Sequence, residues 1–98
     1  MKLNFSPRAQ RDIERCARWW RQNRELAPNL FDEELARALD QIRTAPELSV
    51  RYLAMSGLEH RRVLMPKTEY HVYFRIMNDK VIRIVTVWSG RRKRGPKL

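Results

Sequence analysis

The sequence predicts an α+β domain in which a short amino-terminal strand and an antiparallel helical hairpin precede a three-stranded antiparallel meander packed on the helices. Two observations predict this class. Apolar residues recur at a helical period of about 3.6 in the first half of the chain, and after residue 50 they recur at a period of about 2. The chain has 98 residues, which is the length of one domain. We therefore expect a single domain over residues 1–90 and a basic carboxyl-terminal tail over residues 91–98.

The segment KLNF at residues 2–5 predicts the short first strand, and the first helix begins directly after it. Ser6 followed by Pro7 combines an N-cap residue with proline at the first helical position. From Pro7 to about Asn23, the apolar residues fall on one helical face: Ala9, Ile13, Cys16, Ala17 and Trp20. Arginines are spread around the rest of the cylinder, so this helix has one core face and a cationic remainder.

A second helix follows the break at Pro28 and extends to about Thr44, where Pro46 prevents its continuation. Its inner stripe consists of Phe31, Leu35, Ala38, Leu39 and Ile42. The acidic residues of its first turn suit the positive end of the helix dipole. Because only a short loop joins the two helices, we expect them to form an antiparallel hairpin.

Three segments rich in branched and aromatic residues predict the meander: HRRVLMP at 60–66, YHVYFRIM at 70–77 and VIRIVTVW at 81–88. In the middle strand, alternation gives one apolar face and one polar-aromatic face, which carries His71, Tyr73 and Arg75. In the last strand, alternation places Ile82, Ile84, Thr86 and Trp88 on one side and Val81, Arg83, Val85 and Val87 on the other. Both sides are largely apolar, so the second side needs a cover, and a partner protein is one candidate.

The chain is strongly basic, with 21 Lys and Arg residues against 11 acids and a net charge of +10. The tail holds five of these cations and no acid, but the excess extends over the rest of the chain. This balance favours nucleic acid, an acidic protein or an anionic surface as partner. A solvated basic surface without a partner is the alternative reading. Arginine is far more frequent than lysine, which favours recognition of phosphate or carboxylate.

Cysteine usage and hydropathy exclude several classes of protein. Cys16 is the single cysteine, so no internal disulfide is possible, and no residues at metal-ligand spacing accompany it. We expect no metal site and no cofactor. There is no apolar stretch long enough to cross a membrane and no pattern of a secretion signal, so we expect a cytoplasmic protein without a membrane partner.

The order of the segments carries a resemblance to a known superfamily. LNFSPRAQRDI, a helical hairpin ending in IRTAP, and RRVLMPKTEYHVYFRI followed by VIRIVTVWSGR together resemble the RelE/ParE superfamily of toxins from type II toxin-antitoxin systems. The likeness spans about residues 3–91, and FSPRAQRDI and YHVYFRI match best. The resemblance implies a small α+β toxin that a cognate antitoxin neutralises in a hetero-oligomeric complex.

The superfamily contains ribosome-dependent messenger-RNA endoribonucleases and gyrase-inhibiting toxins. Cleavage of RNA through its 2′-hydroxyl needs a base, an acid for the leaving oxygen and cations for the phosphorane charge. If the chain is a nuclease, Arg62 and Arg75 supply the cations, and His71 or Tyr73 is the candidate base. The same two side chains also suit ordinary packing between strands, so we assign no catalytic residue.

The nuclease branch usually carries a Tyr or His just beyond the last strand, and this chain departs from that pattern. After Trp88 come only Ser89, Gly90 and the basic tail. The departure favours the branch that inhibits DNA gyrase by binding, without catalysis, although the enzymatic question stays open. A basic nucleic-acid-binding module without toxicity is a third possibility.

Two groups of residues are candidates for partner binding. For the antitoxin we expect Trp19, which lies at the edge of the core stripe of the first helix, and Val81, Arg83, Val85 and Val87 on the second side of the last strand. For the target or its nucleic acid we expect Arg91, Arg92, Lys93 and Arg94. We expect the tail to act as a flexible electrostatic arm.

Overall fold

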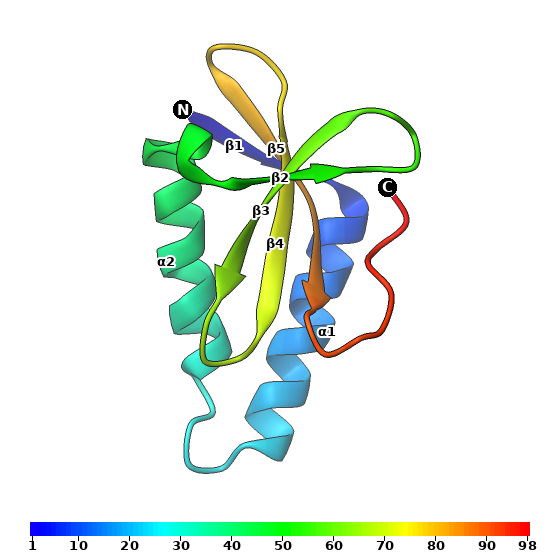
Figure 1. The fold of residues 1–98 in the computed structure, drawn as a ribbon. Helices are drawn as coiled ribbons and strands as arrows, with labels where there is room; N and C mark the ends of the chain where they lie inside the picture. Colours follow the sequence, from blue (N-terminus) through cyan, green and yellow to red (C-terminus); the bar gives the residue numbers. More distant parts are fainter.

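The computed structural model describes residues 1–98 and shows a five-stranded mixed sheet with two helices on one of its faces (Figure 1). The strands lie in the order β1-β5-β4-β3-β2. In chain order the elements are β1 (Lys2–Phe5), α1 (Pro7–Asn23), α2 (Leu30–Thr44), a short 3-10 helix η1 (Pro46–Leu48), β2 (Val50–Leu53), β3 (Glu59–Met65), β4 (Tyr70–Ile76) and β5 (Val81–Ser89). The predicted α+β class, the helical hairpin and the strands of the meander are therefore present.

Helix α1 begins where its capping residues predict. The Ser6 hydroxyl oxygen accepts a hydrogen bond from the backbone N–H of Ala9 at 2.9 Å, and Pro7 occupies the first helical position. The same hydroxyl donates to the carbonyl oxygen of Val85 in β5 at 2.8 Å. The residue that starts the helix therefore also attaches it to the sheet.

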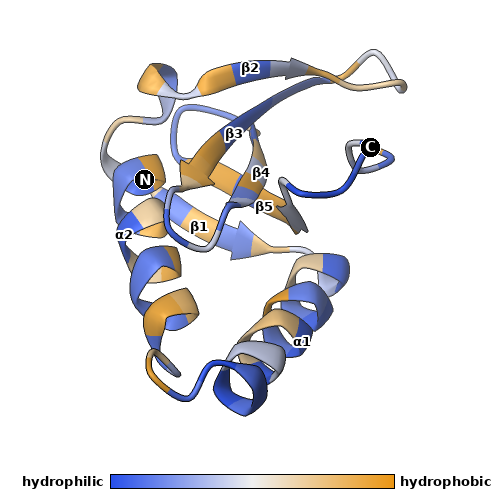
Figure 2. Cartoon of the chain, turned by 60° about the horizontal axis from the view of Figure 1, so that its bottom comes forward, coloured by the Kyte–Doolittle hydropathy of each residue, from blue (hydrophilic) through white to orange (hydrophobic).

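The core lies between the helices and the sheet. Helix α1 packs mainly on β5 and helix α2 mainly on β3. Figure 2 shows apolar residues along β3, β4 and β5, and mixed apolar and polar positions around both helices. The fully buried residues of the core include Ala9 from α1, Phe31 and Ile42 from α2, and Met65, Val72, Phe74, Ile82 and Ile84 from the strands.

The prediction of a three-stranded meander is wrong in number, because four strands follow the helices. The additional strand is β2, which pairs antiparallel with β3 so that Val50 faces Arg62 and Leu53 faces Glu59. The amino-terminal strand β1 also joins the sheet, parallel to β5. Strand β2 has four residues and follows η1 directly, so its sequence VRYL is too short to show the alternation that predicts a strand.

A β-bulge in β5 changes the alternation that the sequence predicts for this strand. Tyr73 pairs with Thr86 while its neighbour Phe74 pairs with Ile84, so Val85 is an extra residue on β5. Beyond the bulge, Val87 is 1% exposed and belongs to the core. Trp88 faces His71 across the strands. The prediction that Val87 lies on the second side of β5 is therefore wrong.

Candidate functional site

The face of the sheet that the helices leave open carries a polar-aromatic cluster, and we call this face the second face. It brings together Tyr52 of β2, Arg62 of β3, and His71 and Tyr73 of β4. The Arg62 guanidinium donates to the Tyr73 hydroxyl at 3.3 Å and lies over the Tyr52 ring at 5.7 Å. The rings of Tyr52 and Tyr73 meet edge to face with centroids 4.9 Å apart. Three of the four residues named for a nuclease thus lie together.

The two candidate bases of this cluster, Tyr73 and His71, lie in different environments. Tyr73 is only 1% exposed, and its hydroxyl is already engaged by Arg62. Burial, and secondarily the positive charge of Arg62, lowers the pKa of His71, so its imidazole is neutral near pH 7. The fourth nuclease candidate, Arg75, pairs across the strands with Arg83, and its Nε is buried without a hydrogen-bond partner.

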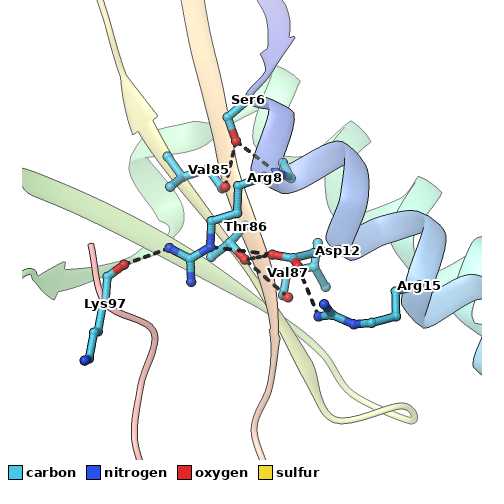
Figure 3. Close-up of polar contacts among 9 residues, drawn as sticks. Ser6, Arg8, Asp12, Arg15, Val85, Thr86, Val87 and Lys97 are labelled. Atoms are coloured by element: carbon cyan, nitrogen blue, oxygen red, sulfur yellow. Dashed lines mark hydrogen bonds and ion pairs between the residues drawn. The ribbon is translucent and has the colours of Figure 1, made fainter.

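The basic tail, residues 91–98, lies on the molecule and does not extend away from it. The indole N–H of Trp88 donates to the carbonyl of Arg94 at 2.9 Å. The Arg8 guanidinium donates to the carbonyl of Lys97 at 2.7 Å, as Figure 3 shows. The backbone N–H of Ser56 donates to the Leu98 carbonyl at 3.2 Å. Figures 1 and 2 place the end of the tail beside the β2–β3 hairpin. The prediction of a flexible arm is therefore wrong for this structure.

The start of the tail is held at the β3–β4 turn. The backbone N–H of Gly90 donates to the carbonyl of Glu69 at 2.6 Å, and Arg91 forms an ion pair with the Glu69 carboxylate. The Arg92 guanidinium lies 4.2 Å from the centroid of the Trp88 ring. Arg91, Arg92, Lys93 and Arg94, the residues predicted to contact the target, are all exposed. Their charges are thus presented to solvent from a positioned backbone.

A cleft of about 460 Å³ lies between α1 and the end of β5. Arginines Arg15, Arg24, Arg91 and Arg92 line it together with tryptophans, and no acidic residue does. Trp19, predicted for the antitoxin, is 44% exposed in this cleft, with Arg24 stacked 5.0 Å from its ring centroid. Tryptophan and arginine are the residues that most often dominate protein interfaces.

Two buried polar groups in the lining of this cleft have no hydrogen-bond partner: the indole N–H of Trp20 and the hydroxyl of Thr68. Such groups are rare in folded proteins. Cys16 also lines the cleft, and burial raises the pKa of its thiol, which keeps it protonated and unreactive. The sequence pattern points to Trp19 but not to Arg24 or Thr68, because these residues lie in a loop and a turn without a motif.

Three of the remaining four residues predicted for the antitoxin lie away from the cleft. Val81 and Val85 are half-buried on β5, and the Arg83 guanidinium donates to Asn4 of β1 at 2.6 Å. Val87, which lies in the core, also lines the cleft. The structure therefore places these residues on two different surfaces.

A polar network that no sequence motif predicts joins α1 to β5. The Thr86 hydroxyl donates to the Asp12 carboxylate at 2.5 Å, and both side chains are buried (Figure 3). Arg15 and Arg8 flank the same carboxylate at 3.0 Å and 3.7 Å. Because Arg8 also donates a hydrogen bond to the carbonyl of Lys97, this network connects the helix, the last strand and the tail.

No group of three or more His, Cys, Asp or Glu residues is arranged to hold a metal ion. No helix is long and apolar enough to span a membrane.

Comparisons with known proteins agree with this architecture. A solved structure described as the chromosomal ParDE TA system from P. aeruginosa superposes with a TM-score of 0.68 at 12% sequence identity, covering 91% of this chain and 95% of the other. At this identity the likeness concerns the fold alone. The sequence has no match among the curated proteins.

A match to a family model identifies the class of protein as a toxin of a type II toxin-antitoxin system. The family model described as the ParE toxin of the type II toxin-antitoxin system parDE matches residues 3–94. The chain therefore belongs to the ParE toxin family, within the RelE/ParE superfamily.

Proposed function

We propose that this toxin acts by binding DNA gyrase and trapping it on cleaved DNA, without catalysing a reaction itself. Inhibition of gyrase is typical of the ParE family. The observation that carries the proposal is the burial of Tyr73, which is 1% exposed and bonded to Arg62. A general base must reach the proton that it removes, and this hydroxyl has no path to a bound substrate.

The toxin is held inactive by a cognate antitoxin of the ParD type, as the name of the family implies. The cleft at Trp19 is the main docking surface in this proposal, because no acidic residue lines it and two of its arginines, Arg24 and Arg92, form no ion pair. An acidic partner segment that also carries an apolar anchor residue supplies the negative charge that is missing from the cleft lining. Val81, Arg83 and Val85 form a second, smaller contact.

A supercoiling assay with purified gyrase tests the proposed target. The toxin is expected to inhibit supercoiling and to increase the yield of linear DNA after denaturation of the gyrase–DNA complex. Adding the antitoxin should reverse both effects. If supercoiling proceeds normally at a large excess of toxin, gyrase is not the target.

The clustering of Arg62, His71 and Tyr73 supports a second candidate, a ribosome-dependent messenger-RNA endoribonuclease. Replacing Tyr73 by Phe and His71 by Gln separates the two functions. Under the gyrase proposal, both variants still arrest growth, and transcripts on toxin-treated ribosomes remain intact. Primer extension on ribosome-bound transcripts provides the measurement. Transcript cleavage that disappears in either variant would establish the nuclease instead.

A further inference from the structure

The contacts that dock the basic tail are made mainly by its backbone carbonyl groups and not by its charged side chains. The carbonyl oxygens of Arg94, Lys97 and Leu98 accept the hydrogen bonds, and Pro96 is buried. Gly95 lies so close to Tyr52 that an added Cβ atom would collide with the tyrosine hydroxyl. Backbone groups and small residues thus fix the path of the tail. Its cations, apart from Arg91, are paired with no acid.

The sheet adjacent to the docked tail carries further arginines without acidic partners. Arg62, Arg75 and Arg83 lie on β3, β4 and β5, and none of them forms an ion pair. Arg75 and Arg83 face each other across neighbouring strands, an arrangement that like charges disfavour. The buried Nε of Arg75 also lacks an acceptor. An anion bound between the guanidinium groups of Arg75 and Arg83 would relieve their repulsion.

Docking of the tail brings positive charges close together, and their repulsion opposes docking. When the tail is docked, its cations are brought next to a face that already holds three arginines, so repulsion opposes the uncharged contacts. A polyanion that touches both sets of cations binds the docked state more tightly than the undocked state. By linkage, binding of the polyanion stabilises docking, and docking strengthens binding.

We propose that the docked tail and the arginines of the second face form one surface for the backbone of duplex DNA, and that DNA binding and tail docking favour each other. The tail exposes four consecutive cations, Arg91 to Arg94, and its buried Pro96 faces the protein. Arginine predominates over lysine in this chain, and its guanidinium matches phosphate geometry. The proposal deepens the gyrase assignment, on which the choice of DNA as the polyanion rests.

Amide hydrogen exchange at Ser56 reports docking directly, because the acceptor for this N–H is the carbonyl of Leu98. Adding a short DNA duplex of mixed sequence to the full-length toxin should slow exchange at Ser56. A chain that ends at Lys93 provides the undocked reference and should show fast exchange with and without DNA. Unchanged exchange in the full-length toxin, under conditions where it binds the duplex, would refute the coupling.

Two matched variants separate a positioned tail from a flexible one. Gly95→Val keeps every charge and blocks the contact with Tyr52, whereas Lys93→Gln removes one charge from an exposed position without a docking contact. Each phosphate contact contributes about eightfold to affinity at about 0.1 M salt, with a slope of about 0.9 in log affinity against log salt. We expect Gly95→Val to weaken duplex binding by at least about this factor and Lys93→Gln by no more than one such step.

The outcomes distinguish this proposal from its alternatives and from the proposed function. If Lys93→Gln weakens binding but Gly95→Val does not, the tail acts as a flexible arm and the positioned surface is refuted. If polyglutamate of matched charge binds as tightly as the duplex and protects Ser56 equally, DNA is the wrong partner. Because these measurements contain no gyrase, a toxin that fails to inhibit gyrase can still pass them, and one that inhibits gyrase can still fail.

Discussion

Glu34 shows how one side chain can link two elements. It lies in α2 directly after the first turn and is only 3% exposed, and its carboxylate accepts hydrogen bonds from the backbone N–H groups of Lys67 at 2.9 Å and Thr68 at 2.7 Å. Burial alone would raise its pKa, yet these donors prevail and hold the pKa of Glu34 below its ordinary value. The β3–β4 turn, which carries Glu69 and the start of the tail contact, is thus fixed by α2.

Replacing Glu34 by Gln is expected to lower the free energy of unfolding by about 1–3 kcal/mol, because a buried charge-assisted pair of hydrogen bonds becomes weaker. The folded-state pKa is depressed, so the stabilisation is complete above the unfolded-state pKa of about 4.3 and is lost as the pH falls through the folded-state value. Urea unfolding at pH 7 and at pH 3 should therefore show a large difference between wild type and variant at pH 7 and a small one at pH 3.

The neighbouring substitution Glu33→Gln is the control, since Glu33 is exposed in the same helical turn. It should change the unfolding free energy by less than about 0.5 kcal/mol at both pH values. Equal losses from the two substitutions would mean that the helix dipole, and not the contact with the turn, is what Glu34 contributes.

At the scale of elements, the sequence predicts a helix or strand correctly where its pattern is local. The bounds of α1 and α2 follow from Ser6, Pro7 and the apolar period, and β3, β4 and β5 follow from alternation. Strand β2 and the parallel pairing of β1 do not follow, because four-residue strands acquire their register from partners distant in the sequence. The bulge at Val85 is non-local too, since its carbonyl is bound by Ser6, which is 79 positions away in the chain.

Ser6→Ala tests the hydrogen-bonded connection between α1 and β5. The substitution removes the N-cap hydrogen bond to Ala9 and leaves the Val85 carbonyl without its hydroxyl donor. We expect a loss of about 1–3 kcal/mol in unfolding free energy, of which capping alone accounts for about 1 kcal/mol. Thermal or urea unfolding measures this loss, and Ser6→Thr, which keeps the hydroxyl, should recover most of it. A loss below about 0.5 kcal/mol would show that the bulge does not depend on Ser6.

At the scale of the whole molecule, the candidate site was only partly predictable. Alternation correctly places His71, Tyr73 and Arg75 together, because their spacing on one strand decides the face. The docked tail and the cleft depend on where three-dimensional packing brings carbonyl groups, Gly95 and Arg24, and none of these gives a sequence signal. Composition predicts that the tail is cationic, but not that uncharged contacts position it.

The net charge of +10 and the arginine-lined cleft predict that electrostatic attraction accelerates association with the antitoxin. Long-range attraction accelerates encounter and is screened by salt, whereas the buried contacts that hold a complex together are less sensitive to salt. Between about 0.05 and 0.5 M salt, the association rate constant for an acidic ParD-type antitoxin should fall by about tenfold or more, with little change in the dissociation rate constant.

Substitutions on α1 locate this effect within the molecule. Arg24→Ala removes a cation that directly follows α1, lines the cleft and stacks on Trp19, while Arg18→Ala removes an exposed cation of α1 outside the cleft. Both should slow association slightly, because both reduce the net charge. Only Arg24→Ala should accelerate dissociation, by about tenfold, since it loses a desolvated contact of about 1–2 kcal/mol. If the two variants dissociate at the same rate in surface-based binding kinetics, the antitoxin binds elsewhere.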